Sequence, residues 1–429
     1  MEPYKTSSYP KNQPKIFYGW YIVVAATILR IYNSLTFSYG FTSFVDPITT
    51  THSWTYAQVS LATSLRGVES GVFNPFLGMA VDRWPVRRLM IIGICLMALG
   101  IYLISQSSSL TMFYLSFLVV GLGTSIAVMM VPRVVLARWF HRNLGKASGI
   151  LATANVVGGL VAPVVVAMID SFGWQTVLVF ISIGVLGLGM PVSMLFRDRP
   201  EKYGFLPDGK VTVGIKSEAT SDEGFTVREA LNMRPFWYIG LPLMLQTTIV
   251  SAVSVHQMPY LTSIGFERST SAIAITIFSV VSIGARLTSG FLADVFPKKY
   301  VLAMAMMLVG LGIFILQLAD GSSFTMVILY AVIYGVGIGG SVPLKAPLMR
   351  EYFGLKRFGS ILGIMSFFTM FGSIIGAPLT GLVYDMRGSY YPMWFVYSGL
   401  IVGGLSLILA LPRPAFGKPS STTEEERSQ

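Results

Sequence analysis

A few ionisable side chains lie inside long apolar stretches of the sequence, and these residues are the first candidates for chemistry. Arg286 lies near the middle of one stretch, with no acidic residue within one helical turn along the sequence. A charged side chain at membrane depth is costly and is by default a candidate functional residue. Because a guanidinium can donate two parallel hydrogen bonds to a carboxylate, we expect Arg286 to bind an organic anion. A salt bridge to another helix is the alternative.

Four further residues in apolar stretches are candidates for binding or proton transfer. Arg30 and its neighbour Asn33 are predicted to contact the same anion. Glu69 is the only acidic residue deep in any stretch, and it either neutralises Arg30 or the nearby Arg66 or carries a proton. His256 either binds the anion or carries a proton, since imidazole titrates near neutral pH. An ordinary interfacial histidine is the alternative interpretation for His256.

The elements that position these residues are predicted to be transmembrane helices. The chain of 429 residues has 53% hydrophobic and 12% charged residues, whereas a soluble domain has roughly 25% charged residues. The apolar stretches reach the roughly 20 residues that span a bilayer, and they lack the alternation of a transmembrane barrel. We predict twelve spans, at residues 17–42, 57–80, 88–107, 109–135, 147–169, 174–196, 235–259, 270–292, 300–319, 323–349, 359–383 and 390–411.

The distribution of basic residues predicts the orientation of these spans. Of the 31 Lys and Arg residues, 24 lie in the two tails and the even-numbered loops, and only Arg268 and Arg387 lie in odd-numbered loops. Basic residues concentrate on the cytoplasmic side of membrane proteins, so both termini are predicted to be cytoplasmic. The net charge of +11 therefore requires no nucleic-acid partner.

The chain divides into two related halves. Residues 1–16 form a predicted cytoplasmic tail, 17–196 a six-helix bundle, 197–234 a polar cytoplasmic linker, 235–411 a second six-helix bundle and 412–429 a second tail. The loop GMAVDRWPVRR has a second copy, GFLADVFPKK, that places Asp82 and Asp294 212 residues apart. The same offset relates Arg133 to Lys345. Parallel repeats of this kind occur in transporters built from two similar halves.

The repeated loops predict a latch between helices. Asp82 and Asp294 each end a span beside basic residues, which in the first loop are Arg83, Arg87 and Arg88. We expect these residues to hold one state of a rocking bundle; fixing the topology by positive charge is the alternative. Arg133 and Lys345 are predicted to gate the cytoplasmic end, and snorkelling toward the interface is the alternative for both.

These motifs resemble the major facilitator superfamily over essentially the whole chain. Four segments resemble its branch of monocarboxylate transporters and oxalate–formate antiporters: FYGWY at 17–21, RWF at 138–140, HQMPYL at 256–261 and ARLTSGFLAD at 285–294. The resemblance implies two pseudo-symmetric bundles of six helices, alternating access and a carboxylate-binding role for Arg286. Two residues depart from the pattern: Pro85 replaces a usual glycine, and Ser282 stands where many proton symporters have an acid.

The predicted function is secondary active transport of a small organic anion, such as lactate or pyruvate, across the inner membrane. Tyr334 and Phe367 are predicted to line the path beside the charged residues. Coupling by proton symport and coupling by anion exchange both remain open, and the alternative substrate is a larger or uncharged solute. A receptor on the same scaffold that does not transport is a further alternative. One cysteine, three histidines and no phosphate-binding loop predict no enzyme activity, metal or cofactor, and we expect a monomer.

Overall fold

The structure is a computed structural model that describes residues 17–34, 42–159, 162–203, 205–209, 224–319 and 324–414. Nearly all of these residues are helical, and the one β-bridge among them joins Gly224 to Gly354. The predicted tails, apart from residues 412–414, and residues 210–223 of the predicted linker lie outside the described residues.

The first half of the chain is here called the N half, and its described residues form nine α-helices. They are α1 (Tyr18–Asn33), α2 (Thr42–His52), α3 (Tyr56–Arg83), α4 (Val86–Ser105), α5 (Leu110–Thr124), α6 (Val131–Trp139), α7 (Leu144–Gly159), α8 (Ala162–Phe172) and α9 (Trp174–Leu195). A π-helical segment, Ser125–Met130, joins α5 to α6 without a loop.

The second half, here called the C half, follows two short 3₁₀ turns and the short helix α10 (Val227–Asn232). Its helices are α11 (Arg234–Ser263), α12 (Arg268–Val295), α13 (Lys298–Leu318), α14 (Phe324–Ser341), α15 (Lys345–Phe353), α16 (Phe358–Arg387) and α17 (Tyr391–Leu409). A 3₁₀ turn, Val342–Leu344, joins α14 to α15.

These elements correspond to the twelve predicted spans. Among the described residues, nine continuous helices are long and apolar enough to cross a membrane. The remaining three spans correspond to α1, to α3 and to α7 with α8. The helix α1 has only 16 residues, α3 is less apolar because it includes Arg66, Glu69, Asp82 and Arg83, and residues 160–161 between α7 and α8 are outside the described residues.

Apart from the end of the first span, the helices begin and end within four residues of the predicted bounds. The predicted span 17–42 begins with α1 (Tyr18–Asn33), and its residues 35–41 lie outside the described residues. Spans four and ten continue past their predicted ends, to Trp139 and Phe353. Each of these two spans changes its helical register near a proline, Pro132 or Pro343, because proline lacks the N–H that continues an α-helix. Arg133 and Lys345 lie six and eight residues before the ends of these two spans.

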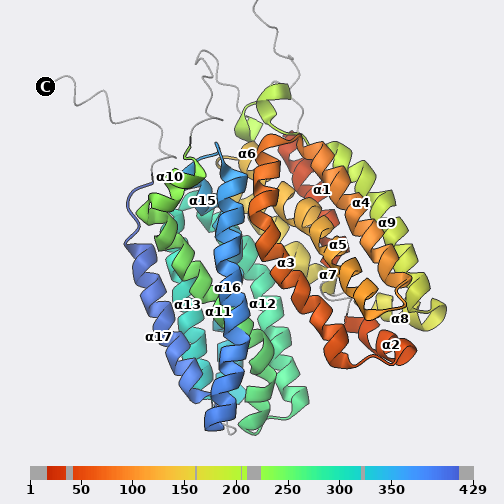
Figure 1. The fold of residues 1–429 in the computed structure, drawn as a ribbon. Coiled ribbons are helices and arrows are strands. Elements are labelled where there is room, and N and C mark those ends of the chain that lie inside the picture. The colour runs from red at the N-terminus through yellow and green to blue at the C-terminus, as the bar shows by residue number, and fades with distance from the viewer. Residues whose placement is uncertain are drawn as a thin grey trace, which may run out of the picture.

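The two halves pack along two matching helix pairs. Figure 1 shows α3 beside α16, and their axes diverge toward the end away from α10. A Cβ atom added at Gly78 would lie 2.1 Å from the carbonyl oxygen of Gly359, so these two backbones approach closely. In the matching pair, α7 and α12, a Cβ atom at Gly145 would lie 2.2 Å from the carbonyl oxygen of Gly290. Small residues permit such close approach between membrane helices.

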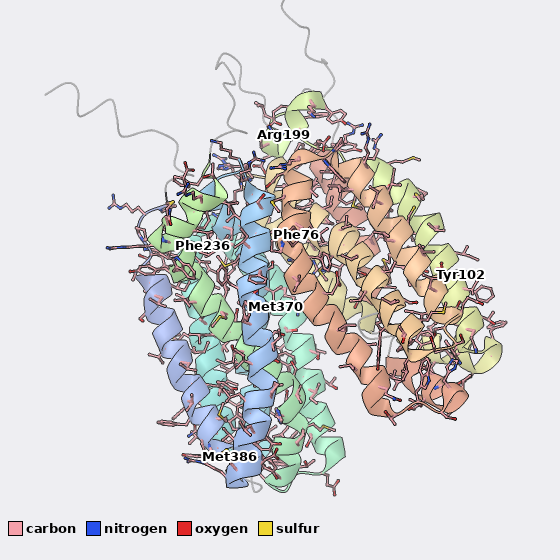
Figure 2. All side chains as sticks on the ribbon, in the orientation of Figure 1. Phe76, Tyr102, Arg199, Phe236, Met370 and Met386 are labelled. Atoms are coloured by element: carbon pink, nitrogen blue, oxygen red, sulfur yellow. The ribbon has the colours of Figure 1, made fainter. Side chains whose placement is uncertain are left out.

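The end of the molecule that carries α10 and the described linker segments is here called the linker end. Figure 2 places Arg199 at this end and Met386 at the opposite end, with Met370 between them. Aromatic side chains fasten the linker to the N half, since the ring of Phe205 lies 6.5 Å from Phe17 and 6.4 Å from Trp139. The described part of the linker is therefore anchored to the bundle.

Candidate functional site: a cationic cavity between the halves

A cavity of about 170 Å³ lies between the two halves. The N half contributes residues from α1, α6 and α7, and the C half contributes residues from α11, α15 and α16 and from the 3₁₀ turn. The wall consists of Arg30, Arg133, Leu136, Ser148, Leu151, Ala152, Leu243, Val342, Pro343, Lys345, Ala346, Met349, Leu362, Met365, Ser366 and Thr369. The site thus needs both halves for its construction.

Three of the wall residues are cations and none is acidic. Arg30 and Arg133 come from the N half, and Lys345 comes from the C half. Arg30 is 5% exposed and lies within electrostatic range of Arg133, which in turn acts on Lys345. Like charges repel more strongly in a protein interior than in water, so an anion in this cavity would stabilise all three cations.

The helical breaks position two of these cations. Arg133 is the third residue of α6, and α6 begins directly after the π-helical segment. Lys345 is the first residue of α15, directly after the 3₁₀ turn. The repeat that the sequence revealed therefore produces two matching cations on opposite sides of one cavity. Arg133 and Lys345 lie six and eight residues before the linker-end termini of α6 and α15, and their gating role stays a prediction.

Arg286 lies next to the cavity without lining it. Its Nη1 donates a hydrogen bond of 2.7 Å to the carbonyl oxygen of Ala152, which is a wall residue. Arg286 also acts electrostatically on Arg30. Arg286, which was predicted to bind the substrate carboxylate, is therefore close enough to act electrostatically on the site. Its guanidinium contacts the backbone of α7 across the boundary between the halves.

The structure does not bring Asn33 or His256 to the cavity wall. Asn33 is fully buried in α1, and its Oδ1 accepts a hydrogen bond of 3.2 Å from the hydroxyl of Thr124. His256 lies within the C half, where Nε2 is 2.9 Å from the carbonyl oxygen of Ala377 and Nδ1 is 3.3 Å from the hydroxyl of Tyr390. Both predicted ligands thus contact helices of their own half.

The predicted aromatic wall is also absent from the described cavity. Tyr334 is buried in α14, and its ring stacks on Tyr330 at 5.4 Å and packs against Phe278 at 5.5 Å. Phe367 lies in α16 with its ring 5.1 Å from that of Phe371. The cavity wall is aliphatic instead, with leucine, alanine, methionine and proline between the polar groups.

Glu69 is buried in α3, at 3% exposure, and does not line the cavity. The side chain of Arg66, the partner considered for it, lies outside the described residues. Proton transfer through Glu69 stays a prediction.

At the linker end, Asp82 joins the two halves. Its carboxylate accepts hydrogen bonds from the backbone amides of Gly359 at 3.1 Å and Ser360 at 2.8 Å, and from the Ser360 hydroxyl at 2.7 Å. These donors lie at the start of α16, where a helix leaves its first amides unpaired and carries partial positive charge. Asp82 also lies 3.6 Å from Arg138 of its own half.

Asp294 makes the matching contact in the opposite direction. Its carboxylate accepts hydrogen bonds from the amides of Gly145 at 2.6 Å and Lys146 at 2.9 Å, at the start of α7. Arg350 of α15 adds a third link between the halves through its hydrogen bond to the carbonyl oxygen of Phe140. These three contacts close the described linker end.

The basic residues predicted to join the latch do not all take part in it. Arg83, Arg87 and Arg88 are exposed, and Arg87 donates to the carbonyl oxygen of Met194 within the N half at 2.9 Å. Sequence reasoning missed Arg138 as the buried partner of Asp82, and it missed Arg350. Arg138 stood in a recognised motif, but nothing in the sequence indicated its contact.

Two six-helix halves, closed against each other at one end and enclosing a charged site, define a membrane transporter. The family model of the Major Facilitator Superfamily matches residues 26–273 and 254–429. The chain belongs to this superfamily, and the predicted fold, family and transporter class are confirmed.

Curated relatives and solved structures resemble the chain over most of its length. Human monocarboxylate transporter 2 is 24% identical over 416 residues, which cover 92% of this chain and 86% of that protein. Bovine monocarboxylate transporter 13 is 24% identical over 97% of this chain and 95% of its own length. Two solved structures share the fold. The proton:xylose symporter XylE has a TM-score of 0.74 and 12% identity, and the match covers 94% of this chain and 97% of that one. The human organic anion transporter MFSD10 has a TM-score of 0.69 and 14% identity, and the match covers 92% of this chain and 100% of that one.

Proposed function

We propose that this protein transports a small organic anion, such as the monocarboxylates lactate and pyruvate, by alternating access across the inner membrane. The observation that carries the proposal is the cavity between the halves, with Arg30, Arg133 and Lys345 in its wall. A carboxylate bound there contacts cations from both halves at once. The names of the relatives, monocarboxylate transporters 2 and 13, support the same substrate class.

The size of the cavity favours a small substrate. Its volume of about 170 Å³ is below the range of about 300–1,000 Å³ that is usual for pockets of drug-sized ligands. A larger solute, such as a siderophore or a drug, would require the wall to move apart. The three cations in the wall also favour an anion over an uncharged solute, because each of them attracts a negative charge.

The linker end is the cytoplasmic side in this proposal, because basic residues concentrate in its loops. Asp82, Asp294 and Arg350 then hold the cytoplasmic end closed. Breaking these contacts while the halves approach each other at the opposite end would expose the same cavity to the cytoplasm. The protein acts as a monomer, because one chain supplies the complete site.

The coupling ion is a separate part of the proposal. Ser282, at the position where related symporters have an acid, is buried and donates to the carbonyl oxygen of Ser279 at 2.8 Å. A serine there cannot carry a proton in the manner of a carboxylate. Exchange of one anion for another therefore stands beside proton symport through Glu69.

The test is uptake of labelled lactate and pyruvate into proteoliposomes that contain the purified protein. Uptake with a trans anion but without a pH gradient indicates exchange, and uptake that follows a pH gradient indicates symport. Oxalate and an uncharged sugar serve as comparison substrates. Lack of flux and of binding for both monocarboxylates would refute the proposed substrate.

Variants of the wall connect any flux to the site. Lys345→Gln and Arg133→Gln each remove one cation from the cavity, and losing a hydrogen bond to a charged group costs about 1.5–3 kcal/mol. We expect KM for lactate to rise roughly 10- to 100-fold in each variant. Arg387→Gln, which removes an exposed cation at the opposite end of α16, is the matched control and should leave KM unchanged.

A further inference from the structure

Directly before each helical break beside the cavity, a residue makes a hydrogen bond with a polar side chain from the first long helix of the same half. In the C half, Gln246 of α11 donates from Nε2 to the hydroxyl oxygen of Ser341 at 2.6 Å. In the N half, the hydroxyl of Thr124 donates to Oδ1 of Asn33 at 3.2 Å. All four side chains are buried, between 0% and 3% exposed.

The bond in the C half lies directly before the segment that forms the cavity wall. Ser341 is the last residue of α14, and its hydroxyl donates in turn to the carbonyl oxygen of Ile338 at 3.0 Å. The following residues Val342 and Pro343 line the cavity, and Lys345 lies two residues further on, after Leu344. A shift of Ser341 would therefore move the ammonium group of Lys345 relative to Arg30 and Arg133.

A segment that interrupts an α-helix depends more on stabilising contacts from neighbouring helices than a regular helix does. The 3₁₀ turn Val342–Leu344 has poorer hydrogen-bond geometry than an α-helix, and Pro343 contributes no backbone donor. Its position therefore depends more on contacts from neighbouring helices. Gln246 supplies such a contact, and Leu243, one helical turn earlier on α11, lines the cavity itself.

We propose that Gln246 and Ser341 are positioning residues that set the place of the Lys345 ammonium group. Gln246 and Ser341 do not line the cavity, so they act on the bound anion only through Lys345. This inference rests on the proposed function for its effect on transport, but the position of residue 345 can be tested without any substrate.

The transport test compares paired substitutions. Ser341→Ala removes the hydroxyl and Ser341→Thr restores it, while Gln246→Met removes the amide with little change of shape. We expect Ser341→Ala and Gln246→Met to raise KM for lactate about three- to tenfold, the equivalent of one hydrogen bond, with kcat little changed. Ser341→Thr should restore KM, and the double variant should be no worse than either single variant, because one shared bond is lost.

The matched control is Ser182→Ala in α9. Ser182 is also buried, and its hydroxyl donates at 2.9 Å to the carbonyl oxygen of Ala98 in another helix, away from the cavity. It should lower the melting temperature about as much as Ser341→Ala while KM stays unchanged. An unchanged KM in Ser341→Ala, or an equal rise of KM in the control, would overturn the inference.

The second readout uses a fluorine label at residue 345. Cys95, the single cysteine, is replaced by serine, and Lys345→Cys is labelled with trifluoroethanethiol for ¹⁹F NMR. We expect a shifted or additional resonance when Ser341→Ala is introduced and the original resonance with Ser341→Thr or Ser182→Ala. Identical spectra in all four proteins would refute the positioning role. If the parent protein neither binds nor moves lactate or pyruvate, the proposed function fails while this spectrum still tests the inference.

Discussion

Removing the charge of Asp294 should open the linker end. The substitution Asp294→Asn keeps the size of the side chain but replaces one carboxylate oxygen by an amide group. The native carboxylate accepts hydrogen bonds from the amides of Gly145 and Lys146 at 2.6 and 2.9 Å. Both donors belong to the N half and Asp294 belongs to the C half, so the lost interaction acts between the halves.

The magnitude follows from these two bonds. A hydrogen bond to a charged group contributes about 1.5–3 kcal/mol and a neutral one about 0.5–1.5 kcal/mol. Asparagine keeps one acceptor oxygen, so one bond becomes neutral at a cost of about 1 kcal/mol, while the other amide faces an NH₂ donor and loses its bond at a cost of about 2 kcal/mol. The total of about 3 kcal/mol changes the ratio of open to closed linker ends roughly 150-fold.

The assay is a distance measurement by double electron–electron resonance. Spin labels are attached at Lys202→Cys and Lys356→Cys, two exposed positions at the linker end of the N half and the C half, after Cys95 is replaced by serine. We expect the parent protein to give mainly the shorter distance of the closed end. The Asp294→Asn protein should show a second, longer distance with a much larger share of the population.

Two further variants make the result decisive. Asp198→Asn is the control, since Asp198 accepts from the amide of Val86 at 2.8 Å at the start of α4, within one half. It should leave the distances unchanged. Asp82→Asn should act as Asp294→Asn does and in addition destabilise the N half, because buried Arg138 loses a counter-charge. Unchanged distances in both Asp82→Asn and Asp294→Asn would refute the prediction that these two carboxylates hold the linker end closed.

Two predictions concern other parts of the boundary between the halves. Burial in the surrounding protein is the main cause that lowers the pKa of His141 below its usual 6.5, and the Arg350 guanidinium is the next. The His141 imidazole therefore binds a proton less well when the linker end is closed than when it is open. Lowering the pH from 7.5 through 6.5 should therefore increase the longer spin-label distance, and His141→Gln should weaken this dependence. Gly363→Ala should also favour separation, because its Cβ would lie 2.3 Å from the carbonyl oxygen of Asn74. Gly399→Ala, where a Cβ meets no atom within 4 Å, should leave the distances unchanged; an equal response of both glycine variants would contradict the close packing.

The sequence predicted the architecture because its signals are local or periodic. Apolar length predicted the helices, and the 212-residue offset of Asp82 and Asp294 predicted two matching halves. Both aspartates do lie at helix ends beside the boundary. Their donors were not predictable, because they are backbone amides 277 and 149 residues away. Any residue but proline supplies such a donor, so it has no signature in the sequence.

The site was predicted less well for two physical reasons. Hydropathy located Arg133 and Lys345 near the ends of spans four and ten, but it does not indicate that both side chains face a cavity between the halves. The face of a helix that meets the other half also depends on packing, so the sequence could not distinguish Arg286, beside the wall, from Arg30, within it. Sequence reasoning nevertheless identified all four cations as charged residues within predicted spans.

The carboxylate-to-backbone contacts at the linker end have a consequence for how such a chain can diverge. The backbone amides of Ser360 and Lys146 donate whatever side chain these positions carry, so most substitutions there preserve these donors and at Ser360 remove only the hydroxyl bond. The position beside each carboxylate is restricted instead: a Cβ at Gly145 would lie 2.6 Å from Asp294, and one at Gly359 would lie 2.9 Å from Asp82. Related proteins can therefore differ at most residues of the linker end where the halves meet. They must keep the two aspartates and, far from each aspartate in the sequence, the glycine that faces it.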